Sequence, residues 1–185
     1  MALKTMYCTT LDSGWKWKQR DTSITDITKE LQLPHGTYKI DAETATKRSW
    51  LPVRTTPSEI HVELLKAGLI PDPHVGFNEH KFQCELSIFL LEYTTLDVTT
   101  GIGQVGWLYT CPLLDIDSTR KLAVLKFQGL DRLCDIYING HLVRSVDNMF
   151  QTHALCIPKD VLKPSNNLLL LHPLQNWPRY RGGDG

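Results

Sequence analysis

The dipeptide Asn139-Gly140 is the sequence feature that most restricts what this chain can fold into. Both residues tolerate the positive φ angles of a two-residue type I′ turn, which joins antiparallel strands well. The residues before the turn alternate, and three apolar side chains share one face: Cys134, Ile136 and Ile138. The sequence therefore predicts a β-hairpin with one buried face.

Antiparallel β-structure is predicted on both sides of this hairpin. Residues 122–127 alternate with a period of two, as expected for a strand with at least one buried face. Leu142 and Val143 begin the return strand, and the turn-prone pair Asp147-Asn148 ends it. Two further strands are predicted later in the chain, at 152–157 and 168–171.

One short helix is predicted to begin at Thr56. Thr56 can act as the N-cap, Pro57 suits the first helical position, and Glu59 completes a capping box. The apolar residues that follow at helical spacing share one face: Ile60, Leu64 and Ala67. Gly68 is the expected stop signal.

His61 and Glu63 of this helix could be read as ligands. Residues two apart on a helix do not share a face, so we predict that both are solvated polar side chains. The chain has no His-Glu-x-x-His motif, zinc-ligand spacing or phosphate loop. The sequence therefore predicts no metal, no cofactor and no catalytic residue.

The length and charge of the chain restrict the classes of function that it can have. The chain has 185 residues, enough for one domain with a real core. It carries 20 basic and 20 acidic residues, so charge does not indicate a nucleic-acid or anionic-lipid partner. No stretch approaches the roughly 20 apolar residues of a membrane span.

The five cysteines are odd in number, scattered and without a Cys-x-x-Cys pair. This usage favours buried thiols in a reducing compartment over a disulfide framework. The first residues, MALKTMYCTTLDSG, lack the apolar core of a secretory signal. We therefore expect a cytoplasmic location.

Trp15 and Trp17 lie two positions apart in the first predicted strand, so they fall on the same side. Two such rings could form a sugar-stacking platform. Tryptophans at this spacing more often anchor the edge of a sandwich, and we favour that structural role.

Gly101, Gly103 and Gly106 match the dinucleotide-binding pattern G-x-G-x-x-G. That motif works only when its last glycine opens a helix whose N-terminus meets the pyrophosphate. Here a strand-like stretch, 107–112, follows instead. We therefore predict no nucleotide site.

Seven segments occur in a characteristic order: Ser13-Gly14-Trp15, Trp50-Leu51-Pro52-Val53, 60–79, Trp107-Leu108-Tyr109, the Phe-x-Gly-Leu-Asp of 127–131, the Ile-Tyr-Ile-Asn-Gly of 136–140, and Asp147-Asn148-Met149-Phe150. Together they resemble the N-terminal domain of β-mannosidases in glycoside hydrolase family two. The similarity covers most of the chain, from about residue 11 to residue 171.

This resemblance implies an all-β fold, an antiparallel jelly-roll β-sandwich of the galactose-binding-like type with one or two short helices. The domain would cover residues 1–171, followed by a divergent, disordered tail at 172–185. In the family, the loop that ends at Asn78 and Glu79 faces the catalytic barrel. Asn78 and Glu79 are therefore candidates for binding a substrate hydroxyl, although capping of a turn is the simpler reading.

Two stretches depart from the family. Residues 83–104 form an apolar, β-prone insert where the family has a short link, and we interpret it as a translated intron or gene-model error. The tail lacks the Trp-Asp-Trp-Gly-Pro segment with which the family continues towards its substrate pocket.

Retaining glycosidases need two carboxyl groups about 5 Å apart. By the resemblance, both are glutamates on a separate (β/α)₈ barrel, which takes at least ~200 residues. We therefore expect this chain to be a non-catalytic sugar-binding or supporting domain of a β-mannosidase-type enzyme, with a β-mannoside or the barrel as its partner. A free-standing carbohydrate-binding or protein-interaction module is the alternative.

Overall fold

The structure is a computed structural model that describes residues 8–21, 23–33, 49–54, 56, 58–72, 74–76, 106–113, 116, 122–130 and 133–174. Its elements are mostly strands: β1 (Lys16–Gln19), α1 (Ile27–Glu30), β2 (Leu51–Pro52), α3 (Ile60–Lys66), β3 (Trp107–Leu113), β4 (Val124–Phe127), β5 (Cys134–Ile138), β6 (His141–Val146), β7 (His153–Cys156), a 3₁₀ helix (Lys159–Val161) and β8 (Asn167–Pro173). The predicted strands and the all-β class are confirmed.

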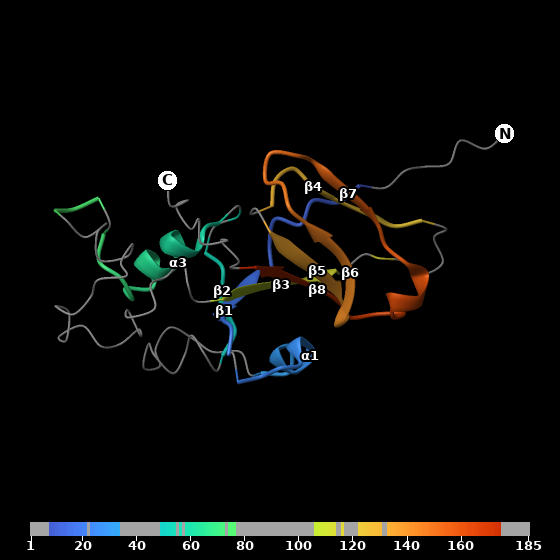
Figure 1. Cartoon of the computed structure of the whole chain (residues 1–185), viewed down its shortest axis with the longest axis horizontal. Helices are drawn as coiled ribbons and strands as arrows, with labels where there is room; N and C mark the ends of the chain where they lie inside the picture. The colour runs from blue at the N-terminus through green and yellow to red at the C-terminus, as the bar shows by residue number, and fades with distance from the viewer. Residues whose placement is uncertain are drawn as a thin grey trace, which may run out of the picture.

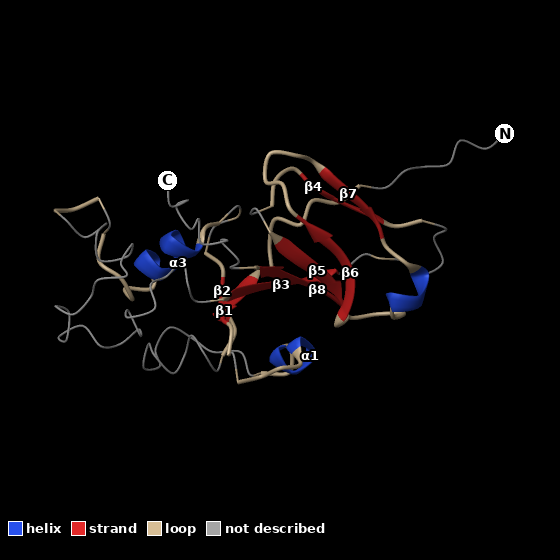
Figure 2. Ribbon diagram, in the orientation of Figure 1, coloured by secondary structure: helices blue, strands red, loops and turns tan. Residues whose placement is uncertain are grey.

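The strands form two antiparallel sheets. The large sheet has the order β2-β1-β3-β8-β5-β6, and β4 pairs with β7 in the small one. Figure 1 shows the small sheet on one side of the large sheet and α1 on the other. Figure 2 shows the same two β layers, with the helices at the periphery. The architecture is an antiparallel β-sandwich.

Both faces of strand β8 are buried, which explains its uninterrupted apolar run. Leu169 and Leu171 pack into the core between the two sheets, together with Ile136 and Ile138 of β5. Leu170 faces the opposite side, where it packs with residues of α1. Because both faces of β8 are buried, its sequence does not alternate between apolar and polar residues.

The hairpin prediction is confirmed. Asn139 and Gly140 connect β5 to β6 with φ angles of 52° and 89°. The Asn139 amide donates to Val161 O at 2.7 Å and to Asn167 Oδ1 at 2.8 Å. Its own Oδ1 accepts a bond from Leu168 N at 3.0 Å. The side chain therefore ties the hairpin to the start of β8.

The start of the helix differs from the prediction. Helix α3 begins at Ile60 after an extended Glu59, and Glu59 makes no side-chain capping bond. The carboxylate of Glu63 instead accepts bonds from Arg54 N at 3.2 Å and from Ser58 Oγ at 2.5 Å. The preceding segment folds onto Glu63, so Thr56 is not the cap.

Glu63 also differs from the prediction, because its side chain is fully buried rather than solvated. Its carboxylate is satisfied by the segment before the helix, through contacts that lie outside helical periodicity. The exposed position of His61 is as predicted. Gly68 ends the helix with φ 73°, and Leu69 N donates to Leu64 O at 2.9 Å.

The predicted domain boundary falls inside β8. His172 and Pro173 belong to this strand, and Leu174 N donates to Leu133 O at 2.7 Å. The insert at 83–104 and residues 175–185 of the tail lie outside the described residues.

Candidate functional site

The two predicted substrate-binding residues, Asn78 and Glu79, lie outside the described part of the chain. The loop that leads to them is described as far as Gly76. Asp72 accepts a bond from His74 N at 2.9 Å, and Val75 N donates to Asp72 O at 3.2 Å. The approach to Asn78 and Glu79 is thus a hydrogen-bonded turn.

The tryptophan platform does not form, and the structural role of the two rings is confirmed. Trp17 is 0% exposed, and its ring lies 5.8 Å from that of Trp107 at an interplanar angle of 60°. Trp15 is half-buried against the inter-sheet core and donates from Nε1 to Leu11 O at 2.9 Å. Neither ring offers a sugar a flat, open face.

The glycine motif leads into a strand, as predicted. Gly106 comes directly before β3, which continues through Pro112 to Leu113. Arg20 N donates to Gly106 O at 2.7 Å. Gly101 and Gly103 lie outside the described residues. A strand in this position leaves no helix N-terminus for a pyrophosphate.

Polar side chains gather on the face of the large sheet that carries α1. We call them the polar row: Arg20, Asp135, Tyr137, Ser145 and His172. Asp135 of β5 is paired with Ser145 of β6 on one side and with His172 of β8 on the other. Arg20 directly follows β1 and reaches over to His172.

Hydrogen bonds connect the members of the polar row. Arg20 Nη1 lies 3.2 Å from Nε2 of His172. Asp135 accepts a bond from Ser145 Oγ at 2.5 Å and one from the Tyr137 hydroxyl at 3.4 Å. Tyr137 also packs against the apolar cluster under α1.

Burial controls the ionisation of this row. Burial, and then the nearby Arg20 guanidinium, lowers the pKa of His172 to about 4. Arg20 has only donors, so the ring nitrogen that faces it must accept, and a neutral imidazole can do so. Burial and the charge of Asp135 raise the pKa of Tyr137. At neutral pH the row therefore presents one cation, one carboxylate and three neutral groups.

A second polar group lies beneath α1 and anchors this helix to the sheet. The ammonium of Lys18 contacts the carboxylate of Glu30, and both side chains are fully buried. Glu30 also accepts a bond from Asp21 N at 3.0 Å, and its carbonyl accepts one from Trp50 Nε1 at 2.8 Å. Lys18 Nζ lies 5.9 Å from the centre of the Trp50 ring.

The chemistry available here is hydrogen bonding. The polar row offers donors and acceptors suited to hydroxyl groups. The carboxylates of Glu30, Glu63 and Asp135 are each held by donors of their own. Among the described residues, no group of three or more His, Cys, Asp or Glu side chains could hold a metal ion. Nor is any helix in these described ranges long and apolar enough to cross a membrane.

Sequence reasoning missed both polar groups. Arg20 and His172 are 152 positions apart, and no local motif links them. The one available signal was Asp135 and Tyr137 on the polar side of a strand whose other side is fully apolar. That signal alone does not identify their partners.

A family model, that of the glycosyl hydrolase 2 galactose-binding domain-like family, matches residues 38–179. The match covers more than half of the chain. The chain belongs to this family. The described sandwich is the expected fold of a galactose-binding-like domain.

Relatives of this galactose-binding-like domain are β-mannosidases. β-Mannosidase B of Thermothelomyces thermophilus is 31% identical over 162 residues, which cover 87% of this chain and 14% of the relative. β-Mannosidase B of Aspergillus terreus (strain NIH 2624 / FGSC A1156) is 28% identical over 123 residues, which cover 64% of this chain and 12% of the relative.

A solved structure supports the fold. The crystal structure of a β-D-mannosidase from Dictyoglomus thermophilum matches 92% of this chain with a TM-score of 0.61 and 22% identity. The galactose-binding-like domain covers 16% of that chain. This chain thus spans a small fraction of the length of the proteins it resembles.

Proposed function

We propose that this chain is the N-terminal, non-catalytic domain of a β-mannosidase-type glycoside hydrolase. The supporting observation is the family match over residues 38–179, shared with β-mannosidases of which the chain covers 12% and 14%. In the complete enzyme the domain supports the catalytic barrel and helps to wall the pocket for a terminal β-mannosyl residue. The cleaving carboxylates belong to the barrel.

An aryl β-mannoside assay tests this proposal. The purified chain is expected to give no turnover above the blank. A chimera of the Thermothelomyces β-mannosidase B, in which this chain replaces the matching segment, is expected to hydrolyse the substrate. The same enzyme without the segment is the control. Turnover by the chain alone, or an inactive chimera, contradicts the proposal.

We further propose that Asn78 and Glu79 contact a substrate hydroxyl in the complete enzyme. Their position directly after the hydrogen-bonded turn at Asp72 supports this assignment. In the active chimera, Asn78→Ala and Glu79→Gln should each raise KM for the mannoside. His74→Ala, an exposed position of the same loop, is the matched control. Equal KM values in all three variants would contradict the assignment of Asn78 and Glu79 to substrate binding.

The polar row supports a second candidate, a free-standing carbohydrate-binding module. Its donors and acceptors lie beside the aromatic ring of Tyr137, where Ser145 is exposed and Asp135 is half-buried. Titration of the isolated chain with a manno-oligosaccharide separates the two candidates. Saturable binding that is weakened by Asp135→Asn favours the binding module. The absence of measurable binding favours the enzyme domain.

Two further proposals concern the chain itself. The odd number of scattered cysteines, without a Cys-x-x-Cys pair, supports a reducing, cytoplasmic compartment. Microscopy of the tagged protein tests this location.

The family-atypical composition of residues 83–104 supports an origin in a translated intron or gene-model error. A spliced transcript that encodes these residues in frame would disprove that origin.

A further inference from the structure

The turn between β6 and β7, residues 147–152, presents an aromatic side chain to solvent. Phe150 is 88% exposed and Met149 is 39% exposed. We call this segment the Phe150 turn. Phe150 makes little contact within the chain, so the fold gains almost nothing from an aromatic residue at this position.

The Phe150 turn is nevertheless well supported. Asn148 Oδ1 accepts a bond from Phe150 N at 2.9 Å, and Nε2 of His153 lies 2.7 Å from Asn148 O. The loop after β4 packs directly beneath, since a Cβ on Gly129 would lie 3.3 Å from Met149 O. An aromatic side chain on such a turn is preorganised and loses little freedom on binding.

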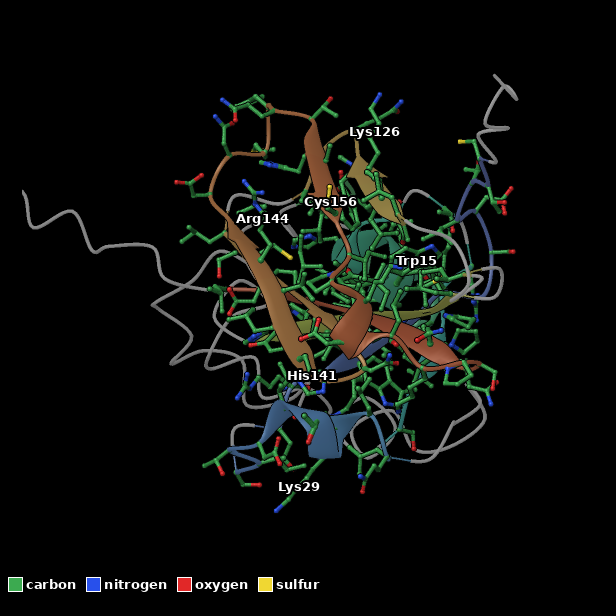
Figure 3. All side chains as sticks on the ribbon, turned by 90° about the vertical axis from the view of Figure 1, so that its right-hand side faces the viewer. Trp15, Lys29, Lys126, His141, Arg144 and Cys156 are labelled. Carbon is green, nitrogen blue, oxygen red and sulfur yellow. The ribbon has the colours of Figure 1, made fainter. Side chains whose placement is uncertain are left out.

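The small sheet beside this turn also exposes apolar side chains. Val124 of β4 is 50% exposed and Leu122 before it is 64% exposed. Exposed Cys156 lies opposite Val124, and the turn is next to the pair Phe127 and His153. Figure 3 shows Lys126 and Cys156 of this sheet at the opposite side of the molecule from Lys29 of α1.

We propose that Phe150 is the anchor by which this domain docks onto an apolar pocket in the remainder of a longer glycoside hydrolase. The inference rests on the proposed function. The chain covers 12–16% of the first matching β-mannosidases, so most of each such protein is available as the partner. The zero net charge of the chain suits an apolar contact better than a charge-steered one.

An exposed aromatic residue that becomes fully buried is typical of the few residues that dominate an interface. Burying a Phe side chain stabilises by about 1.5–3 kcal/mol, which corresponds to a factor of roughly 10–150 in a docking equilibrium. Phe150→Ser should therefore raise the undocked population by about tenfold or more. Leu142→Ser is the matched control, because Leu142 is 55% exposed but lies on β6.

The test uses the isolated chain and the chimera described above. A protease site placed at the junction after the domain reports undocking, since cleavage follows the population of the open form. Phe150→Ser should speed cleavage of the chimera by about tenfold or more, and Leu142→Ser should not. In the isolated chain, Phe150→Ser should leave Tm unchanged, because the side chain is exposed. Hydrogen exchange of the peptide 147–153 should be slower in the chimera than in the isolated chain.

The outcomes separate the two proposals. If the unmutated chimera is active but both variants are cleaved at equal rates, the docking inference fails and the proposed function stands. If the unmutated chimera is inactive, both fail. A loss of Tm in the isolated Phe150→Ser chain would show an internal role. Dimerisation of the chain that Phe150→Ser abolishes would identify a second copy as the partner. Either result overturns the docking inference.

Discussion

Gly140, at the tip of the β5–β6 hairpin, lies directly against Thr28 of α1. A Cβ built on Gly140 would be 2.7 Å from Cγ2 of Thr28. Thr28 cannot easily turn away, because Asp26 Oδ1 accepts bonds from its backbone N at 2.9 Å and from its hydroxyl at 2.7 Å. Two segments that are distant in the sequence thus meet at a contact that only glycine permits.

Gly140→Ala is expected to destabilise the chain by about 2–4 kcal/mol, from backbone strain at φ 89° together with overpacking. Gly76→Ala is the control, because Gly76 has φ 62° but nothing within 4 Å of an added methyl group. It should lose about 1–2 kcal/mol from strain alone. Urea unfolding measures both. Thr28→Ser removes the obstructing methyl group and should partly rescue Gly140→Ala; no rescue would contradict the contact.

The buried pair Lys18 and Glu30 should behave as one unit. Glu30→Ala leaves the Lys18 ammonium buried without its carboxylate, and we expect a loss of about 3–5 kcal/mol. The double variant Lys18→Met/Glu30→Leu replaces both charges with apolar groups and should recover most of this loss. A double-mutant cycle from denaturant unfolding checks the coupling. Additive losses would show that the two side chains do not depend on each other.

His172 should make the stability of the fold pH-dependent. Its pKa is about 4 in the folded chain, against an ordinary value of 6.5, because burial and Arg20 oppose its charge despite the facing Asp135. Between these two values only the unfolded chain takes up the proton. Stability is therefore greatest above pH 6.5 and falls by at most roughly 3 kcal/mol as the pH approaches 4.

Replacing His172 with Gln should remove most of this slope, as measured by Tm from about pH 4 to pH 7. His61→Gln is the matched control, because His61 is exposed on α3 and faces solvent. Equal slopes in wild type, His172→Gln and His61→Gln would show that other groups cause the acid sensitivity.

The cysteines should divide into two reactivity classes. Cys8 and Cys156 are exposed, whereas Cys111 and Cys134 are buried. Burial raises the pKa of Cys111 to about 11, from 9.0. At about pH 8 the thiolate fraction of Cys111 is then about 100-fold lower than that of a thiol with a pKa of 9.0. Alkylation of buried Cys111 should therefore be much slower than that of exposed Cys156. Peptide mapping after iodoacetamide treatment measures this difference. Equal labelling of Cys111 and Cys156 in the native chain would contradict the burial.

The local patterns of the sequence predicted the hairpin at Asn139-Gly140 and the buried face of Cys134, Ile136 and Ile138. Both depend on neighbouring residues, through turn geometry and the two-residue repeat of a strand. The helix start at Thr56 was wrong, because the capping pattern cannot show that Ser58 and Arg54 bond to Glu63.

The sequence by itself determined the strands, their apolar faces and the similarity to β-mannosidase domains. These features depend on short-range periodicity and on the order of motifs along the chain. Tertiary structure alone decided the partners of Arg20, Lys18 and Gly140. Arg20 meets His172 of β8, Lys18 of β1 meets Glu30 of α1, and Gly140 after β5 meets Thr28 of α1. No spacing along the chain encodes these meetings. The physical reason is that strand pairing and burial, rather than local propensity, bring distant polar groups within hydrogen-bonding distance.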